Sequence, residues 1–445
     1  MLIKTSNIAE NEITGFTPDL DIFGRKALGE AISTLLESTD ENLTIGIDGQ
    51  WGEGKSTFAL MLSAHLNNYK EIPTVYFDSF KNDFQKDAFL AIASELQEIF
   101  ESNTLAPRAE FRTSIIKASK AMARGAIRIA VKTATAGILD DTVLDNLGTS
   151  DSAGDEISDG IDKILASKLD EAKTDKLSLE NFKTVLEKNI ETLGQGKPVV
   201  FILDELDRCR PDFCLELIEQ IKHLFNVKNL KFLIITNRSQ LHASINKRYG
   251  QNINPHLYLQ KFMDLWIELP RIETEFESHT ETYFNHLVKS LTTKDEKPGN
   301  YLIFETLKNL FITNKTSYRG MQKTLSYVAI LINSSKKGTE YLSYYQTAVA
   351  LACFSKAEQP DLIEKIQITD DPLQILNTIF PKQNATKHHS NFIQEHAHIL
   401  LRYISANEVQ QKEMIRNREI DSDFGRMIPA DLFKSINNKL SLFSK

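Results

Sequence analysis

The sequence predicts an α/β protein in which a parallel sheet is followed by a helical region. Short apolar, β-rich segments alternate with segments of helical spacing up to about residue 270, which is typical of a sheet with helices on its faces. The strand candidates are apolar throughout rather than alternating, as expected for strands covered on both faces. From about Phe276 onward no clear strand pattern remains, and the rest of the chain reads as helical.

The elements of the sheet region can be assigned in chain order. A first helix is predicted over residues 21–38, where apolar residues recur at spacings of three and four. The strand candidates are residues 43–49, 73–80, 199–206, 231–237 and 264–270. The helix candidates between them are residues 55–67, 86–100 and 211–226. Pro211 suits the first turn of its helix, and Gly194, Gly196 and Pro198 mark the entry to the third strand.

Length and composition restrict the classes of protein that fit. The 445 residues allow two or three domains at roughly 150 residues each. Fifty-two Lys and Arg against 60 Asp and Glu give a net charge of −8, which excludes a uniformly basic nucleic-acid coat protein but not a local basic patch. Only three cysteines are present, too few for a disulfide framework, and this suggests a reducing compartment.

The segments that would direct a chain to or through a membrane are not evident. The first residues contain no apolar core of a secretory signal, and no window holds about 18 consecutive apolar residues. We therefore expect a cytoplasmic protein without a transmembrane span. The predicted organisation is a first core segment (1–100), a helical insert (101–197), a second core segment (198–272) and a helical lid with a C-terminal helical domain (273–445).

The segment between the first strand and the next helix carries a phosphate-binding pattern. Residues 49–57 read GQWGEGKST and fit G-x-x-x-x-G-K-[ST]. The glycines let backbone N–H groups surround phosphate oxygens, Lys55 would contact the β- and γ-phosphates, and Ser56 would ligate Mg²⁺. The alternative is a glycine-rich turn before a helix. The expected nucleotide contacts are Gly49, Gln50, Trp51, Gly52, Glu53, Gly54, Lys55, Ser56 and Thr57.

A second candidate group of site residues follows the third strand. This apolar strand ends in Asp204 and Glu205, at the edge of a parallel sheet where ligands bind. We expect Asp204 to hold Mg²⁺, directly or through water, and Glu205 to polarise the attacking water. The alternative is a solvated strand end. Arg208 is either an ion-pair partner or a nucleotide contact, and Asn237, after the fourth strand, either senses the γ-phosphate or starts a turn.

Taken together, these motifs resemble the KAP family of P-loop NTPases, within the additional-strand (ASCE) class. The resemblance covers about residues 20–335 and departs from the family at Phe80, where Trp is usual, and at Glu205, where Asp is common. It rests on five stretches: residues 44–57, 76–83, 199–211, 258–270 and 317–328.

The resemblance implies an ATPase core with strand order 5-1-4-3-2 and a helical lid, in which Arg319 occupies the position of a family arginine. Residues 314–317 lack the Asp of the guanine-reading NKxD motif, which favours ATP over GTP. Many family members carry transmembrane helices in the insert, but this insert is not apolar enough to span. Family members are often found in bacterial conflict and phage-defence operons.

The insert contains a basic amphipathic helix, predicted over residues 111–139. Its basic residues fall within one arc of the helix, opposite Ile115, Met122, Ala126 and Ile129. They are Lys117, Lys120, Arg124, Arg128 and Lys132. Such a face can meet membranes, nucleic acid or acidic partners, or it can simply be solvated. The acidic stretch 140–162 could also neutralise it.

These observations favour a Mg·ATP-hydrolysing molecular switch or assembly ATPase that works with protein partners or by self-assembly. Two alternatives stay open: a nucleotide-dependent scaffold with little turnover, and a DNA-stimulated motor that uses the basic stripe. Neither the C-x4-C pair Cys209 and Cys214 nor the histidines between 388 and 398 have a spacing that predicts a metal site.

Overall fold

The computed structural model describes residues 13–85, 87–102, 108–135, 154–274, 277–291, 301–334, 341–368, 372–380, 388–420 and 432–441. The chain divides into two compact units. The sheet unit comprises Glu10–Gly49 and Lys55–Leu269. The second unit contains Gln50–Gly54, the tip of the glycine-rich loop, together with Pro270–Lys445, and we call it the helical unit.

The sheet unit is built on five parallel strands in the order β2-β3-β4-β1-β5. This confirms the predicted α/β class and the strand order 5-1-4-3-2. The register places Asp78 level with Asp204, and Asp48 level with Thr236, so polar residues gather at the carboxyl edge. The strands are β1 (Leu43–Asp48), β2 (Thr74–Asp78), β3 (Val199–Asp204), β4 (Leu230–Thr236) and β5 (Leu265–Glu268).

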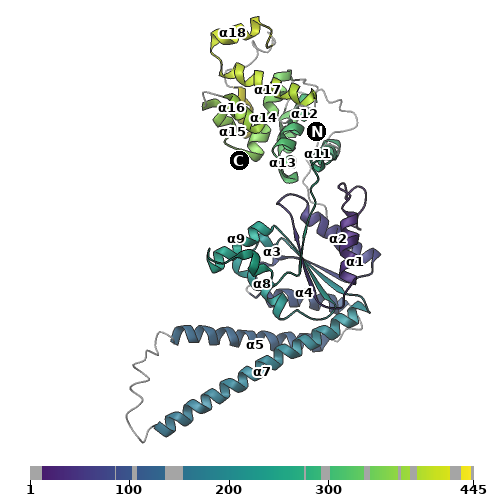
Figure 1. Ribbon diagram of the computed structural model, residues 1–445, viewed down its shortest axis with the longest axis vertical. Coiled ribbons are helices and arrows are strands. Elements are labelled where there is room, and N and C mark those ends of the chain that lie inside the picture. Colours follow the sequence, from purple (N-terminus) through teal and green to yellow (C-terminus); the bar gives the residue numbers. More distant parts are fainter. Residues whose placement is uncertain are drawn as a thin grey trace. The chain divides into compact units, whose positions relative to one another are not determined.

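Helices cover both faces of this sheet (Figure 1). On one face, α1 (Lys26–Glu37) and α2 (Lys55–Tyr69) pack on Val200 and Ile202 of β3. On the other face, α4 (Ala88–Ser102) and α8 (Pro211–His223) pack on the alternate residues of the same strand, including Phe201. Burial on both faces explains why the central strands β1, β3 and β4 are apolar without alternation, whereas the edge strand β5 is partly exposed.

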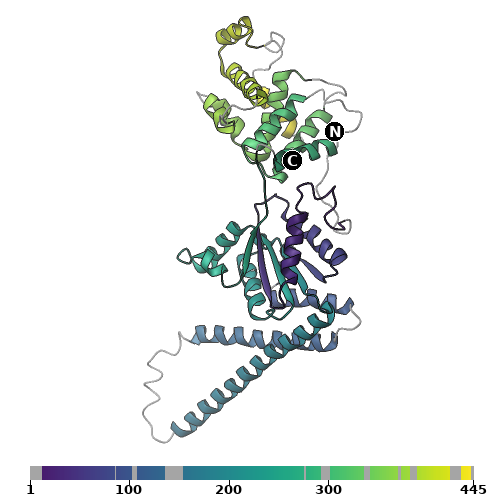
Figure 2. The same ribbon diagram turned by 45° about the vertical axis from the view of Figure 1, so that its right-hand side comes forward.

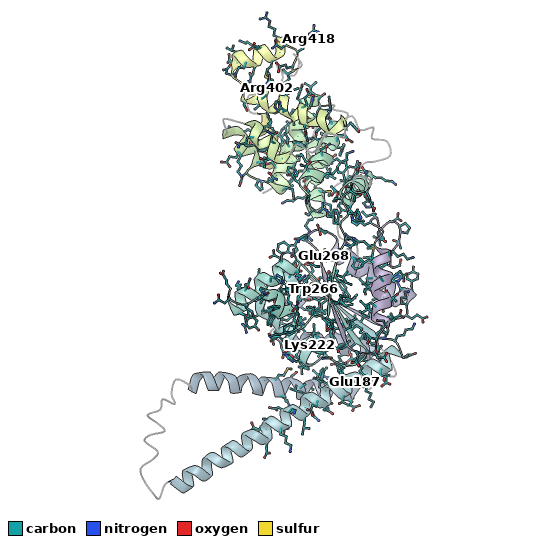
Figure 3. All side chains as sticks on the ribbon, in the orientation of Figure 1. Glu187, Lys222, Trp266, Glu268, Arg402 and Arg418 are labelled. Atoms are coloured by element: carbon teal, nitrogen blue, oxygen red, sulfur yellow. The ribbon has the colours of Figure 1, made fainter. Side chains whose placement is uncertain are left out.

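A glycine in β1 allows the edge strand β5 to carry a large ring. A Cβ built on Gly46 would lie 2.5 Å from the indole of Trp266, so no larger residue fits there without a shift. The Arg238 guanidinium lies 4.8 Å from the centroid of the Trp266 ring, which is a cation–π geometry. Figure 3 shows Trp266 within the sheet region. β5 is thereby fixed against β1, the strand that leads into the loop.

The insert consists of two long helices, α5 (Arg108–Thr135) and α7 (Gly154–Gly194), which pack together and extend from the sheet unit (Figures 1 and 2). Phe111 of α5 and Phe182 of α7 join the core: their rings lie 4.9 Å from Phe100 and 5.0 Å from Phe89, respectively. The insert is therefore helical, as predicted, and aromatic packing roots it on the core.

The predicted basic helix is α5, which begins three residues earlier than predicted. Lys117 and Lys120 are exposed, whereas Ile115 is buried and Met122 packs against the core. For this described half, the basic face is a solvated face of a core-packed helix. Residues 136–139, and the side chains of Arg124, Ala126, Arg128, Ile129 and Lys132, lie outside what the structure describes, as do the acidic side chains of 140–162.

Shorter elements complete the sheet unit. They are α3 (Ser79–Asn82), the 3₁₀ turn Leu206–Arg208, α9 (Arg238–Tyr249) and α10 (Pro255–Leu259). The second strand ends earlier than predicted because the Asp78 side chain accepts a hydrogen bond from Lys81 N (3.0 Å) and starts α3.

Over Pro270–Lys445 the described residues are almost entirely helical, apart from one antiparallel bridge between Glu273 and Ser278. Phe311 and Phe354 pack in the core of this unit. The helices are α11 (His279–Leu291), α12 (Tyr301–Thr313), α13 (Tyr318–Asn333), α14 (Ser343–Glu358), α15 (Leu362–Ile368), α16 (Pro372–Ile379), α17 (His388–Ser405), α18 (Glu408–Arg416) and α20 (Leu432–Ser441). Over the described parts of both units, we find no helix with the length and apolar character that crossing a membrane would require.

Candidate active site

The glycine-rich loop has the backbone conformation that its glycines permit. Gly52 (φ +79°) and Gly54 (φ +77°) lie in the left-handed region, which side chains with a Cβ rarely adopt. α2 begins at Lys55, directly after the loop, so the positive end of the helix dipole faces the loop. The Lys55 ammonium donates to Gly49 O (2.9 Å), which holds this lysine across the base of the loop.

The tip of the loop makes its contacts within the helical unit. Gly52 O accepts a hydrogen bond from Tyr318 N (3.1 Å), at the start of α13. A Cβ on Gly52 would meet Ser317 Oγ at 3.0 Å and Arg319 Cβ at 3.1 Å, so the Arg319 side chain begins beside the loop tip. The Arg319 side chain is exposed, and its role as the family's lid arginine stays a prediction.

The acidic end of β3 is deeply buried at its first carboxylate. Asp204 is 1% exposed and accepts hydrogen bonds from Tyr76 Oη (2.9 Å) and Glu205 N (2.8 Å). Burial nevertheless raises the pKa of Asp204 above its usual value, despite the hydrogen bonds from Ser56 and Tyr76 that favour its ionised form. A buried carboxylate of this kind gains from any cation placed beside it.

Glu205 follows in a strained backbone conformation. Its φ of +59° is uncommon for a non-glycine residue, and such conformations concentrate at functional sites. Its carboxylate accepts a hydrogen bond from Ser56 Oγ (3.1 Å) and forms an ion pair with Arg208. Burial and the neighbouring Asp204 raise the pKa of Glu205, while Arg208 opposes that shift. The structure thus brings Ser56, Asp204, Glu205 and Arg208 together.

The polar residues after β4 lie at the same edge of the sheet. Asn237 is buried, and its side-chain oxygen accepts from Ser239 N (3.1 Å) and Ser239 Oγ (2.6 Å), which caps α9. Thr236 Oγ1 donates to Asp207 (3.3 Å), which connects β4 to the turn after β3. Asn237 therefore caps α9, whereas the predicted alternatives were a γ-phosphate contact and the start of a turn.

An ion pair that the sequence did not predict connects two segments at this edge of the sheet. Asp83, after α3, accepts from Arg210 N (2.8 Å) and from Arg210 Nε (2.6 Å), and Arg210 also donates to Gln85 O (3.1 Å). The contact connects the segment after β2 to the segment after β3, positions 127 residues apart. The signal available in the sequence was the presence of an acid and an arginine in two motifs that follow adjacent strands.

The side-chain oxygen atoms at the carboxyl edge of the sheet suit Mg²⁺ as ligands. Ser56 Oγ, Asp204 and Glu205 offer oxygen atoms only, which is the ligand type that this ion prefers. Across the described residues, no group of three or more His, Cys, Asp and Glu has the arrangement of a metal site built by protein alone. Mg²⁺ commonly binds through one or two protein oxygens, with phosphate oxygens and waters completing its shell.

The three cysteines and His396 have ordinary packing roles. Cys209, Cys214 and Cys353 are buried thiols, and burial raises the pKa of each. His396 stacks on Tyr344 with ring centroids 3.9 Å apart, and burial lowers its pKa. These contacts explain the residues without a reaction.

A match to a known protein family assigns this chain to a class of proteins. Residues 25–349 match the KAP family P-loop domain, so the chain belongs to the KAP family of P-loop NTPases and the predicted family is confirmed. Among solved structures, the ORC2 protein of Aeropyrum pernix, determined as ADPNP and ADP complexes, is similar at 13% identity and a TM-score of 0.38, over 96% of this chain and 98% of that one. No curated protein matches the sequence.

Proposed function

We propose that this protein binds Mg·ATP and hydrolyses it, and that the cycle switches its helical region between two states. The observation that carries the proposal is the contact of the Ser56 hydroxyl, from the phosphate-binding motif, with the carboxylate of Glu205 at the buried acidic end of β3. Membership of a P-loop NTPase family supports nucleotide binding. The acidic strand end supports hydrolysis.

Binding of ATP would use the motif from Gly49 to Thr57. The backbone N–H groups of the loop would cradle the β- and γ-phosphates, and Lys55 would neutralise part of their charge. Ser56 and Asp204 would hold Mg²⁺, which when bound withdraws charge from the β- and γ-phosphate oxygens.

Hydrolysis requires a positioned water molecule in line with the γ-phosphate. Glu205 is proposed to orient this water and accept its proton as the oxygen–phosphorus bond forms and the bond to the β-phosphate bridging oxygen breaks. ADP and phosphate are the products. The raised pKa of Glu205 suits a group that must accept a proton near neutral pH. Because Ser56 and Arg208 now contact Glu205, this carboxylate must turn away from them to reach the water.

The switch would be read out through residues that contact the phosphates. Asn237, beside the acidic strand, and Arg208 are proposed to respond to the γ-phosphate, and Arg319 would relate the loop to α13. We propose that the output is a change in self-assembly or in binding to a protein partner in the cytoplasm. The family's frequent presence in phage-defence operons makes phage challenge of cells carrying Lys55→Ala the natural cellular test.

The direct test is steady-state ATP hydrolysis by the purified chain with Mg²⁺. Glu205→Gln should lower turnover at least ~100-fold while ATP still binds, because the water loses its base. Glu187→Gln on α7, outside the site, is the matched control and should behave like wild type. Turnover that survives Glu205→Gln would contradict the proposed role of Glu205.

The same assay separates the alternative functions. ATP binding with assembly but without measurable turnover would favour the scaffold, which size-exclusion chromatography with and without ATP would reveal. Turnover that rises on addition of DNA would favour the motor.

A further inference from the structure

Glu53 places a carboxylate at the tip of the phosphate-binding loop. The loop collects backbone N–H donors to attract anions, and a carboxylate within it both repels phosphate and competes for those donors. One such contact is already present: Glu53 Oε2 accepts from Gln50 N (3.0 Å), inside the same loop. A loop of this sequence therefore needs a cation that neutralises Glu53 and holds it in place.

Arg271 supplies that cation. Its Nη1 lies 3.2 Å from Glu53 Oε1, and the two side chains are only 14% and 12% exposed, so water screens the pair weakly. The guanidinium of Arg271 also stands over the Tyr318 ring, 5.3 Å from its centroid. All of these residues belong to the helical unit, which includes the loop tip.

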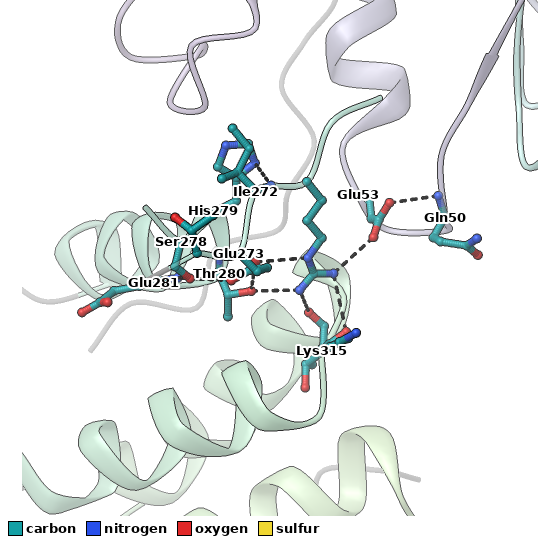
Figure 4. A network of polar contacts seen from close by, with 12 residues as sticks. Gln50, Glu53, Ile272, Glu273, Ser278, His279, Thr280, Glu281 and Lys315 are labelled. Atoms are coloured by element: carbon teal, nitrogen blue, oxygen red, sulfur yellow. Dashed lines mark hydrogen bonds and ion pairs between the residues drawn. The ribbon is translucent and has the colours of Figure 1, made fainter. Parts of the chain in front are cut away.

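The remaining donors of Arg271 are bound by the same unit, which fixes its guanidinium. Nε donates to Glu273 (3.3 Å), and Nη2 donates to Thr280 Oγ1 (2.9 Å) and to Thr316 O (3.0 Å). Figure 4 shows this network, with Glu53 at one end and Glu273, Thr280 and Lys315 at the other. Arg271 is thus held independently of Glu53 and is available to orient it.

Glu273 is the anchor of this arrangement. It accepts from Thr280 N (3.0 Å) and Ser278 Oγ (2.5 Å) in addition to Arg271. Burial alone would raise the pKa of Glu273, but the hydrogen bonds from Ser278 and Thr280 hold that pKa below its usual value. An ionised Glu273 keeps the Arg271 guanidinium in one orientation.

From these contacts we propose that Arg271 is a positioning residue for the nucleotide: it neutralises Glu53 and fixes that carboxylate in one place, so that it does not take further backbone donors of the loop from the phosphates. The proposal rests on the proposed binding of Mg·ATP. It also connects the loop to α11 through Thr280 and to the start of α13 through Thr316, so the loop and these helices share one ionic contact.

The test compares two variants, each of which removes one charge of the Glu53–Arg271 pair. They are expected to change Mg·ATP affinity in different ways. Arg271→Gln leaves Glu53 uncompensated and should weaken Mg·ATP binding at least ~10-fold, with a smaller loss for Mg·ADP because it carries less charge. Glu53→Gln should leave Mg·ATP affinity unchanged or raise it up to about threefold, because it removes a negative charge that repels the phosphates. The double variant should recover most of the affinity lost in Arg271→Gln. Isothermal titration calorimetry with Mg·ATP and Mg·ADP measures all three.

A purely structural role predicts a different pattern, in which both single variants weaken binding and the double variant is no better. That result would overturn the proposal. Arg416→Gln, on the exposed end of α18, is the matched control for loss of an arginine. Should Arg271→Gln fail to fold, as judged by its melting transition, Arg271→Lys keeps the positive charge but loses the planar guanidinium, and should weaken Mg·ATP binding by less than ~10-fold.

A second readout does not depend on nucleotide. Without nucleotide, hydrogen exchange in a peptide covering residues 49–56 should be faster in Arg271→Gln than in wild type or Arg416→Gln, because the Glu53 carboxylate loses its anchor. Unchanged exchange would overturn the positioning role. Faster exchange in a protein whose wild type binds no Mg·ATP would contradict the proposed function and leave the Glu53–Arg271 tie supported.

Discussion

Charged side chains lie at both the amino and the carboxyl ends of the central strands, but their partners differ. At the amino end, the ammonium of Lys231, a residue with 0% exposure, donates to Thr39 O (2.6 Å) and to Glu41 O, so backbone carbonyls satisfy this charge. At the carboxyl end, Asp204 and Glu205 lie side by side, and the pKa of each is raised. The Lys231 charge has backbone partners within the chain, whereas the partner that we propose for the two carboxylates is Mg²⁺.

The largest effect should follow from removing the lysine of the phosphate-binding motif. Lys55→Ala should weaken Mg·ATP binding at least ~100-fold, because the phosphates lose their main positive side chain. Calorimetry with Mg·ATP measures this loss, and Lys70→Ala, later on the same stretch of chain, is the control. Retained affinity in Lys55→Ala would break the comparison, because the carboxyl end would then not be a phosphate site.

A stability change of intermediate size should follow at the amino end. Lys231→Met should lower the free energy of unfolding by about 1–3 kcal/mol, because two buried carbonyls lose their donor. Urea denaturation monitored by circular dichroism measures it. A gain in stability would show that burying the ammonium costs more than its contacts return, contrary to a structural role.

The same variant carries a pH signature. Burial lowers the pKa of Lys231, so the unfolded chain, with a lysine pKa near ~10.4, binds more protons above the folded-state pKa. Wild-type stability therefore gains a contribution that rises with pH through this window. In Lys231→Met that rise should be absent when the two denaturation curves are compared at pH values approaching ~10.

A smaller effect is expected where the carboxyl edge is braced internally. Asp83→Asn should lower the free energy of unfolding by about 1–2 kcal/mol. This is less than the loss expected from breaking a fully buried ion pair, because the Arg210 side chain is 57% exposed. Thermal unfolding of the nucleotide-free protein measures the loss. Mg·ATP affinity should change less than about threefold, since the pair is satisfied within the chain; a much larger loss of affinity would place Asp83 in the site.

The smallest effect should come from the exposed face of α5. Lys117→Glu combined with Lys120→Glu should change stability by no more than about 0.5 kcal/mol, because both side chains are exposed. ATP turnover should be unchanged in the absence of DNA. A salt-sensitive DNA-stimulated turnover in wild type that this variant abolishes would instead favour the motor.

The comparison also shows which features local sequence can predict. The central strands were predictable because they are apolar runs covered on both faces. Lys55, Ser56, Asp204 and Glu205 were predictable because each belongs to a short motif at a strand end. The 41-residue α7 was not predicted as one helix; its apolar residues that contact the core, among those whose side chains the structure describes, lie toward its C-terminal end.

Contacts between distant motifs could not be predicted in the same way. Arg271 and Glu53 are 218 positions apart, and neither segment alone indicates the other. Asp83 and Arg210 meet only because β2 and β3 are neighbours in the sheet. In retrospect, an acidic residue inside a phosphate-binding loop was the signal that a cation should be sought elsewhere in the chain.

The most direct test of the central claim is the stability of Asp204→Asn measured with and without Mg·ATP. A carboxyl group whose folded-state pKa is raised lowers the free energy of unfolding at pH values above its unfolded-state pKa. We therefore expect Asp204→Asn to stabilise the nucleotide-free protein, and to do so more at pH 8 than at pH 5. Mg·ATP should raise the melting temperature of wild type but not of the variant. A variant that is less stable without nucleotide, or that is still stabilised by Mg·ATP, would contradict the claim that this end of the sheet awaits an external cation.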